Sequence, residues 1–166
     1  NYIWFTGYTW SGRLDNLGSH QVKRGEVKTG RAGELIAAGV VEALGYRSVL
    51  CQQAGFDMLL MRDDERHYRC EIKTRSVAVT DSNRKSSKIL RYSWTTATGC
   101  GSKVKLKESA VDLLILVALD IRRCWFIPTF EHDIVRKHIK ADVVKANDEK
   151  RQLDEALARI DKRLKW

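Results

Sequence analysis

Two acidic residues and a lysine lie in neighbouring segments whose residue types favour β-strands. Asp57 precedes the apolar run 58–61, and Glu71 and Lys73 are two residues apart in the next segment. Because side chains alternate between the faces of a strand, Glu71 and Lys73 project from one face. If the segments pair through a turn at 63–65, Asp57 converges with Glu71. Two carboxylates at one point bind a hard divalent cation such as Mg²⁺, and the neighbouring backbone carbonyl can supply a further oxygen.

A lysine beside such a cation has a recognised chemical use. Lys73 can orient or help deprotonate an attacking water, and its charge can stabilise a phosphate group. Glu34, on a helix expected upstream, could hold a water at the cation. These residue types at this spacing therefore predict metal-dependent chemistry on a phosphate ester.

The triplet acid-x-lysine is weak evidence by itself, since it occurs three times in the chain. Only the copy at 71–73 lies in an expected strand, with an acid on the preceding strand and a glutamate on an upstream helix. The alternative is an ordinary surface strand, in which Glu71 and Lys73 are solvated or paired and Arg69 and Arg75 offer further partners.

The charge of the chain favours a polyanionic partner. Lys and Arg number 30 against 21 Asp and Glu, which gives a net charge of +9 and a pI near 9.5. The segment 84–107 holds seven basic residues and no acid, and glycines within it disfavour a membrane-bound helix. It is expected to contact a nucleic-acid duplex, and the alternative is a solvated basic surface. The expected contacts are Arg84, Lys85, Lys88, Arg91, Ser93, Thr95, Lys103, Lys105 and Lys107.

The elements that must position these side chains can be placed from periodicity and from breakers of regular structure. A helix is expected over 30–44, capped by Thr29 and ended by Gly45. Strands are expected at 46–52, 56–62, 67–74, 88–96 (or a hairpin arm there), 111–119 and 122–127. The run 111–119 is apolar enough for a strand buried on both faces. Helices are expected at 131–139 and 148–165. The order predicts a single-domain α/β fold with one central mixed β-sheet flanked by helices.

Two further patterns bear on the surface. In the strand at 88–96, Arg91, Ser93 and Thr95 should face outward, with Leu90, Tyr92 and Trp94 facing inward. His132 and His138 are six residues apart, which does not place them on one helix face, so they are expected on a surface helix rather than at a metal.

Four stretches together resemble the PD-(D/E)XK nuclease superfamily. They are Thr29-Gly-Arg-Ala-Gly-Glu34, Gly45-Tyr46, Gly55-Phe-Asp57 and Cys70-Glu-Ile-Lys-Thr-Arg-Ser76. The resemblance covers roughly residues 28–76 and is greatest to the small intron-encoded homing endonucleases, with Holliday junction resolvases next. It implies a restriction-endonuclease-like core of order α-β-β-β-…-β. It also implies that Asp57 and Glu71 bind metal, that Lys73 is the catalytic lysine and that Glu34 is the helix acid. Phe56 replaces the proline of the family pattern.

The resemblance implies an Mg²⁺-dependent endodeoxyribonuclease, with Mn²⁺ able to substitute, acting on double-stranded or branched DNA. Site-specific double-strand cleavage of the homing type is the first expectation, and a junction resolvase or a non-catalytic DNA-binding module are the alternatives. A homo-oligomer, dimer or tetramer, is expected because one active site cuts one strand. The expected organisation is an aromatic N-terminal extension (1–28), a nuclease core with a basic arm (29–139) and a C-terminal amphipathic helix (140–166). No long apolar run and no signal-peptide pattern appear, so a cytoplasmic protein without membrane contact is expected.

Overall fold

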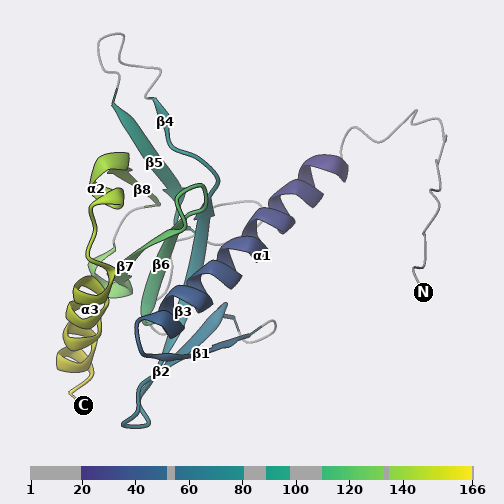
Figure 1. Ribbon diagram of the computed structural model, residues 1–166. Coiled ribbons are helices and arrows are strands. Elements are labelled where there is room, and N and C mark those ends of the chain that lie inside the picture. Colours follow the sequence, from purple (N-terminus) through teal and green to yellow (C-terminus); the bar gives the residue numbers. More distant parts are fainter. Residues whose placement is uncertain (1–19, 52–54, 81–88, 98–109, 133–134, 166) are drawn as a thin grey trace, which may run out of the picture.

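A long strand, β3 (His67–Arg75), forms the centre of a five-stranded sheet (Figure 1). The computed structural model describes residues 20–51, 55–80, 89–97, 110–132 and 135–165, with side chains from 28 onward. The sheet order is β1-β2-β3-β6-β7, and the other strands are β1 (Arg47–Leu50), β2 (Met58–Met61), β6 (Leu113–Ala118) and β7 (Arg123–Pro128). Only the β3–β6 pair is parallel within this sheet. The predicted α/β fold with a mixed central sheet is therefore confirmed.

The middle of the sheet is set by the apolar run of β6. All six residues of β6 are buried, because the strand has a neighbour on each side and layers on both faces. The prediction of a doubly buried strand at this point is confirmed. The turn predicted at 63–65 is confirmed as well: Arg62 N–H donates to Arg66 O at 2.8 Å, and Glu65 takes a positive φ of 66°.

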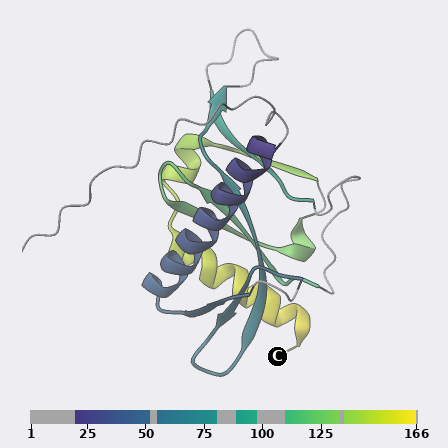
Figure 2. The same cartoon turned by 90° about the vertical axis from the view of Figure 1, so that its right-hand side faces the viewer.

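Two helices cover one face of this sheet. The helix α1 (His20–Ala43) contributes Ala37 and Val41, and α3 (Glu149–Leu164) contributes Leu153 and Leu157, to one buried cluster with Phe126 of β7. Figures 1 and 2 show α1 running diagonally across the sheet, with α3 beside β7 in Figure 1. The C-terminal helix thus docks on its own domain. No helix in the described part of the chain is long and apolar enough to cross a membrane.

A second sheet covers the opposite face. It has the order β4-β5-β8, with β4 (Val79–Thr80), β5 (Leu90–Thr95) and β8 (Arg136–Lys140), and is followed by α2 (Ala141–Lys145). Tyr92 and Trp94 of β5 pack against Leu114 and Leu116 of β6. The Trp94 indole N–H donates to Val117 O at 3.0 Å, which satisfies the one polar group that this buried ring carries.

The N-terminal helix begins earlier than predicted. It starts at His20 instead of residue 30, so Thr29 lies inside α1 and does not cap it. The glycines inside α1 are tolerated because the helix is stabilised by packing on the sheet rather than by helix propensity. The predicted end is confirmed, since Gly45 has a φ of 88°.

The predicted helix over 131–139 is wrong. The chain forms a short 3-10 turn, η1 (Thr129–Glu131), and then the strand β8. The register of β8 with β5 is continued by a bond from Thr96 N–H to Val135 O at 2.8 Å. β8 is an edge strand that is stabilised by pairing with β5, which is distant in the chain, so its own residues give little indication of a strand. Leu90 lies on the same side of β5 as Tyr92 and lines a pocket with it, as predicted, but at the end of the strand it is 50% exposed.

Replacing Gly33 by alanine is expected to be destabilising relative to the matched variant Gly39→Ala. A Cβ atom at Gly33 would lie 1.8 Å from Thr74 Oγ1, whereas one at Gly39 meets nothing within 4 Å. Both changes gain similar helix propensity, about 1 kcal/mol, so their difference isolates the clash, which costs about 1–3 kcal/mol. Urea unfolding followed by circular dichroism measures it. Equal stabilities would contradict the close approach of α1 to β3.

Candidate active site

The candidate site lies where β2 ends and β3 continues. Met58 pairs with Cys70 and Leu59 with Arg69, so the register places Asp57, one residue before β2, opposite Glu71. The Asp57 N–H donates to Cys70 O at 2.9 Å. Beyond this point β2 no longer pairs with β3, and the Asp57 side chain replaces it as the acceptor: its Oδ2 accepts the Ile72 N–H at 2.6 Å. A backbone donor at an open strand edge is thus paired with a carboxylate, as a buried donor requires.

Glu71 and Lys73 lie on the face of β3 that is turned away from the α1 layer. Cys70 and Ile72 belong to the cluster beneath α1, so the alternation predicted for this strand is confirmed. Glu71 is 8% exposed and forms an ion pair with Lys73 through its Oε1. Glu71 is therefore not solvated, while its pairing with Lys73 is what the alternative interpretation also allows.

An arginine–acid pair beside the site keeps the positive charge of Arg69 away from Glu71. Arg69 donates to both Asp112 oxygens, at 3.0 and 2.9 Å, and its backbone N–H donates to Oδ2 at 2.8 Å. This bidentate geometry is strong and directional. Lys73 is therefore the cation that faces Glu71, and Arg69 holds β3 to the segment that enters β6.

The environment of Asp57 favours its protonated form. Burial raises the pKa of Asp57 from 3.8 to about 6; the Ile72 N–H opposes this rise, Glu71 adds to it, Lys73 opposes it and Glu34 adds to it. The carboxylates of Asp57, Glu71 and Glu34 thus share one region of negative potential. A carboxyl pKa raised by burial and by like charges is typical of functional sites.

The position of Glu34 follows from the close approach of α1 to β3. Gly33, next to it, packs against Thr74, whose buried Oγ1 has no hydrogen-bond partner among the described residues. Glu34 itself forms an ion pair with Arg31 at 2.7 Å. It acts on Asp57 through its charge, and the structure gives no direct bond between the two side chains.

The donor set suits a hard divalent cation. The bonds described above use Asp57 Oδ2 and Glu71 Oε1, so Asp57 Oδ1 and Glu71 Oε2 remain for a cation within the described part of the chain. Among those same residues no group of three or more His, Cys, Asp or Glu side chains is arranged to hold a metal. A cation here would thus take two carboxylates and complete its shell with backbone carbonyl, substrate or water oxygens, as Mg²⁺ does.

The predicted duplex contacts divide into two groups. Arg91, Ser93 and Thr95 lie on β5, opposite in direction to the buried Tyr92 and Trp94, as predicted. The remaining predicted contacts fall outside the described residues; they are Arg84, Lys85, Lys88, Lys103, Lys105 and Lys107.

Sequence reasoning missed the strand beside β5. Its outward side chains are Arg136, His138 and Lys140, which were assigned to or beside a helix. The alternation of these exposed residues with Lys137 and the buried Ile139 is the signal that could have revealed a strand.

The histidine prediction is corrected at the same time. Neither His132 nor His138 lies on a helix: a ring nitrogen of His132 is 2.6 Å from Thr96 Oγ1, and His138 is in β8.

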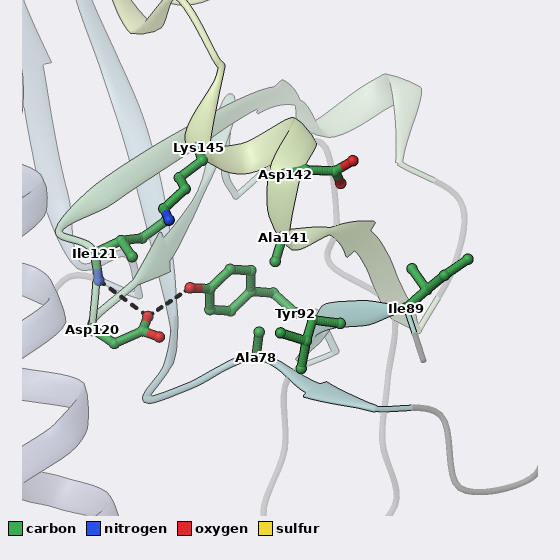
Figure 3. Close-up of a pocket in the computed structure, with 9 residues that line it drawn as sticks. Ala78, Ile89, Tyr92, Asp120, Ile121, Ala141, Asp142 and Lys145 are labelled. Carbon is green, nitrogen blue, oxygen red and sulfur yellow. Dashed lines mark hydrogen bonds between the residues drawn. The ribbon is translucent and has the colours of Figure 1, made fainter. Parts of the chain in front are cut away.

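A pocket of about 480 Å³ lies elsewhere, between β5, α2 and the β6–β7 turn (Figure 3). The Tyr92 hydroxyl donates to Asp120 Oδ1 at 2.7 Å, and Ile121 N–H donates to the same oxygen at 3.1 Å. Burial followed by the Asp120 bond raises the pKa of Tyr92. The Tyr92 hydroxyl, the Ile121 N–H and the Asp120 carboxylate in Figure 3 therefore satisfy one another, and none of the four candidate catalytic residues lines this pocket.

Comparison with known proteins gives one solved structure of note. No protein-family model matches the sequence, and no curated protein matches it either. The chain is similar in structure to a bacterial homing endonuclease, I-Ssp6803I, with a TM-score of 0.47 and 12% sequence identity, over 74% of this chain and 76% of the other. A TM-score below 0.5 is too low to support an assignment, so the function has to be argued from the residues of this chain.

The pKa of Asp57 predicts that Asp57→Asn is more stable than the wild type above pH 6. The folded-state pKa of about 6 lies above the ordinary 3.8, so the favourable contribution of Asp57 is complete below pH 3.8 and is lost as the pH rises through 6. The full shift corresponds to about 3 kcal/mol, and solvent screening of this partly exposed group lowers the expected difference to about 1–2 kcal/mol.

Urea unfolding at pH 4, 6 and 8 in EDTA measures this difference. Asp63→Asn, in the exposed β2–β3 turn, is the matched control and should show no such trend. An Asp57→Asn advantage that is the same at pH 4 and pH 8 would contradict the raised pKa.

Proposed function

We propose that this protein is an Mg²⁺-dependent endodeoxyribonuclease that hydrolyses phosphodiester bonds in DNA. The observation that carries the proposal is the junction of Asp57 and Glu71 beside Lys73 at the open edge of β3. A buried glutamate and a half-buried aspartate with a facing lysine suit a polyanionic substrate only with a cation present, since the acids alone would repel phosphate. The net charge of +9 supports the same substrate class.

Each residue has a role that its surroundings favour. Asp57 and Glu71 would hold Mg²⁺, which polarises a phosphate oxygen and lowers the pKa of a bound water. The ion pair with Glu71 holds the Lys73 ammonium beside the carboxylates, where it can orient the attacking water and stabilise negative charge on phosphate. Glu34 would hold a second water from the α1 side. Mn²⁺, which also accepts oxygen ligands, should substitute.

The type of DNA cleaved is a further part of the proposal. We infer site-specific double-strand cleavage of the homing type, because a basic sheet beside the site can read an extended duplex. Two copies of the chain are then needed, since one site cuts one strand. Cleavage of four-way junctions and DNA binding without cleavage are the two outcomes that would replace this inference.

Loss of the lysine or of the glutamate is expected to abolish cleavage. Lys73→Ala and Glu71→Gln should each reduce the rate by on the order of 10²–10⁴-fold, because positioning and charge at the reacting phosphate are lost. A cleavage assay with Mg²⁺ or EDTA measures the rate and the substrate preference. Its substrates are supercoiled plasmid, a pool of random duplexes and a synthetic four-way junction. Lys162→Ala, exposed on α3, is the control. A purified Glu71→Gln protein that cuts at the wild-type rate would refute the assignment.

Binding of the cation tests the carboxylate pair without any cleavage. Titration calorimetry with Ca²⁺ or Mg²⁺ should show binding to the wild type, and Asp57→Asn should weaken it at least about tenfold, because one of two anionic ligands is lost. Glu155→Gln, exposed on α3, should bind as the wild type does. Absence of binding to the wild type, with or without DNA, would favour the non-catalytic module.

A further inference from the structure

The outward face of the second sheet carries positive charge from two strands. In the β5–β8 register Arg91 lies opposite Lys140, Ser93 opposite His138 and Thr95 opposite Arg136. The three β8 residues are exposed, while Ile139 between them is buried against Tyr92. No described residue of β5 or β8 is acidic. These six residues are called the basic sheet face below.

One pair in the basic sheet face is costly in isolation. Arg91 and Lys140 are directly opposite each other, and like charges in that position are destabilising in a sheet. The Arg91 Nε is also buried with no hydrogen-bond partner among the described residues. The like-charge pair leaves the charge of Lys140, which is exposed, without an acid on β5 or β8 to neutralise it.

Protection of an exposed sheet edge does not account for this pattern. Charged side chains on an edge strand such as β8 discourage pairing with other chains, and either sign of charge serves that purpose. An acid at position 140 would protect the edge equally well and would also pair with Arg91. The choice of a lysine there favours a polyanionic ligand.

The basic sheet face is joined to the candidate site through the backbone. Lys73 lies on β3, which ends at Arg75. Three residues connect the end of β3 to β4, the strand that pairs with β5. Figure 1 shows β4 and β5 extending beyond the end of β3. Glu71 and Lys73 share a face with their register partners Leu114 and Leu116, on which Tyr92 and Trp94 of β5 pack. The basic sheet face is the other side of this second sheet and points away from them.

We propose that the basic sheet face binds the phosphate backbone of duplex DNA, with Arg136 and Lys140 as phosphate contacts. Alternate residues of β8 are spaced about 7 Å apart, so these two side chains span about 13 Å. This length covers about four phosphates of one strand, which rise 3.4 Å each along the duplex axis. Ser93, opposite His138, supplies a hydroxyl donor between them, and Thr95 supplies one opposite Arg136. The inference rests on the proposed function, because it names the surface that holds the substrate.

The test is the salt dependence of DNA binding, measured by fluorescence anisotropy with a labelled 30-base-pair duplex in EDTA, so that no cleavage occurs. Arg136→Gln/Lys140→Gln should weaken binding on the order of tenfold and reduce the slope of log K against log salt by about 1.8, which is 0.9 for each lost phosphate contact. Arg151→Gln/Lys162→Gln, on exposed positions of α3, removes the same net charge. Arg136→Lys/Lys140→Arg keeps both charges and should bind as the wild type does.

The outcomes separate this inference from the proposed function. A reduced slope in the β8 glutamine variant alone, with circular dichroism unchanged, supports the basic sheet face as the DNA-binding surface. Equal losses in the β8 and α3 variants would overturn it and leave the nuclease proposal standing, since binding then follows net charge alone. Failure of the wild type to bind duplex DNA, or tighter binding to duplex RNA, would overturn both.

Discussion

The hydrogen bond from the Ile72 N–H to the Asp57 carboxylate is the interaction on which the candidate site depends. It exists because β3 has nine residues and β2 has four, so β3 continues past its neighbour. A backbone donor at that open edge needs a partner, and a carboxylate just before β2 provides one. The same bond brings an acid to the register position of Glu71. The difference in length between β2 and β3 thus leaves the Ile72 N–H in need of an acceptor and places the carboxylate that accepts it beside Glu71.

The charge of Asp57 in its partly buried surroundings opposes folding and would favour binding of the proposed cation. Burial and two neighbouring acids raise the pKa of Asp57 to about 6, and only the Ile72 N–H and Lys73 oppose this rise. A fold selected for stability alone would place an amide or an apolar residue here. This cost fits the proposed metal site, because a cation would bind most tightly where negative charge is concentrated.

The two sheets carry different sets of polar side chains. The first sheet holds the acids and the lysine on β3, and the second presents basic side chains on β5 and β8. The layer between them is apolar, with Tyr92 and Trp94 packed on β6 and the Trp94 indole bonded to Val117 O. This rigid contact fixes the basic sheet face relative to Lys73, so the proposed binding surface and the proposed reaction centre move as one body.

The sequence by itself determined the features that depend on local periodicity. Alternation along 70–73 placed Glu71 and Lys73 on the face opposite Cys70 and Ile72, the apolar run of β6 revealed a strand covered on both faces, and Gly45 marked the end of α1. Only the tertiary structure decided that the Asp57 carboxylate accepts the Ile72 N–H, that Glu34 pairs with Arg31 and has no direct bond to Asp57, and that 136–140 is a strand. The Asp57 bond and the strand at 136–140 each depend on a partner distant in the chain. The group that a strand edge or a buried charge contacts is set by packing between distant segments, and no local sequence pattern encodes that contact.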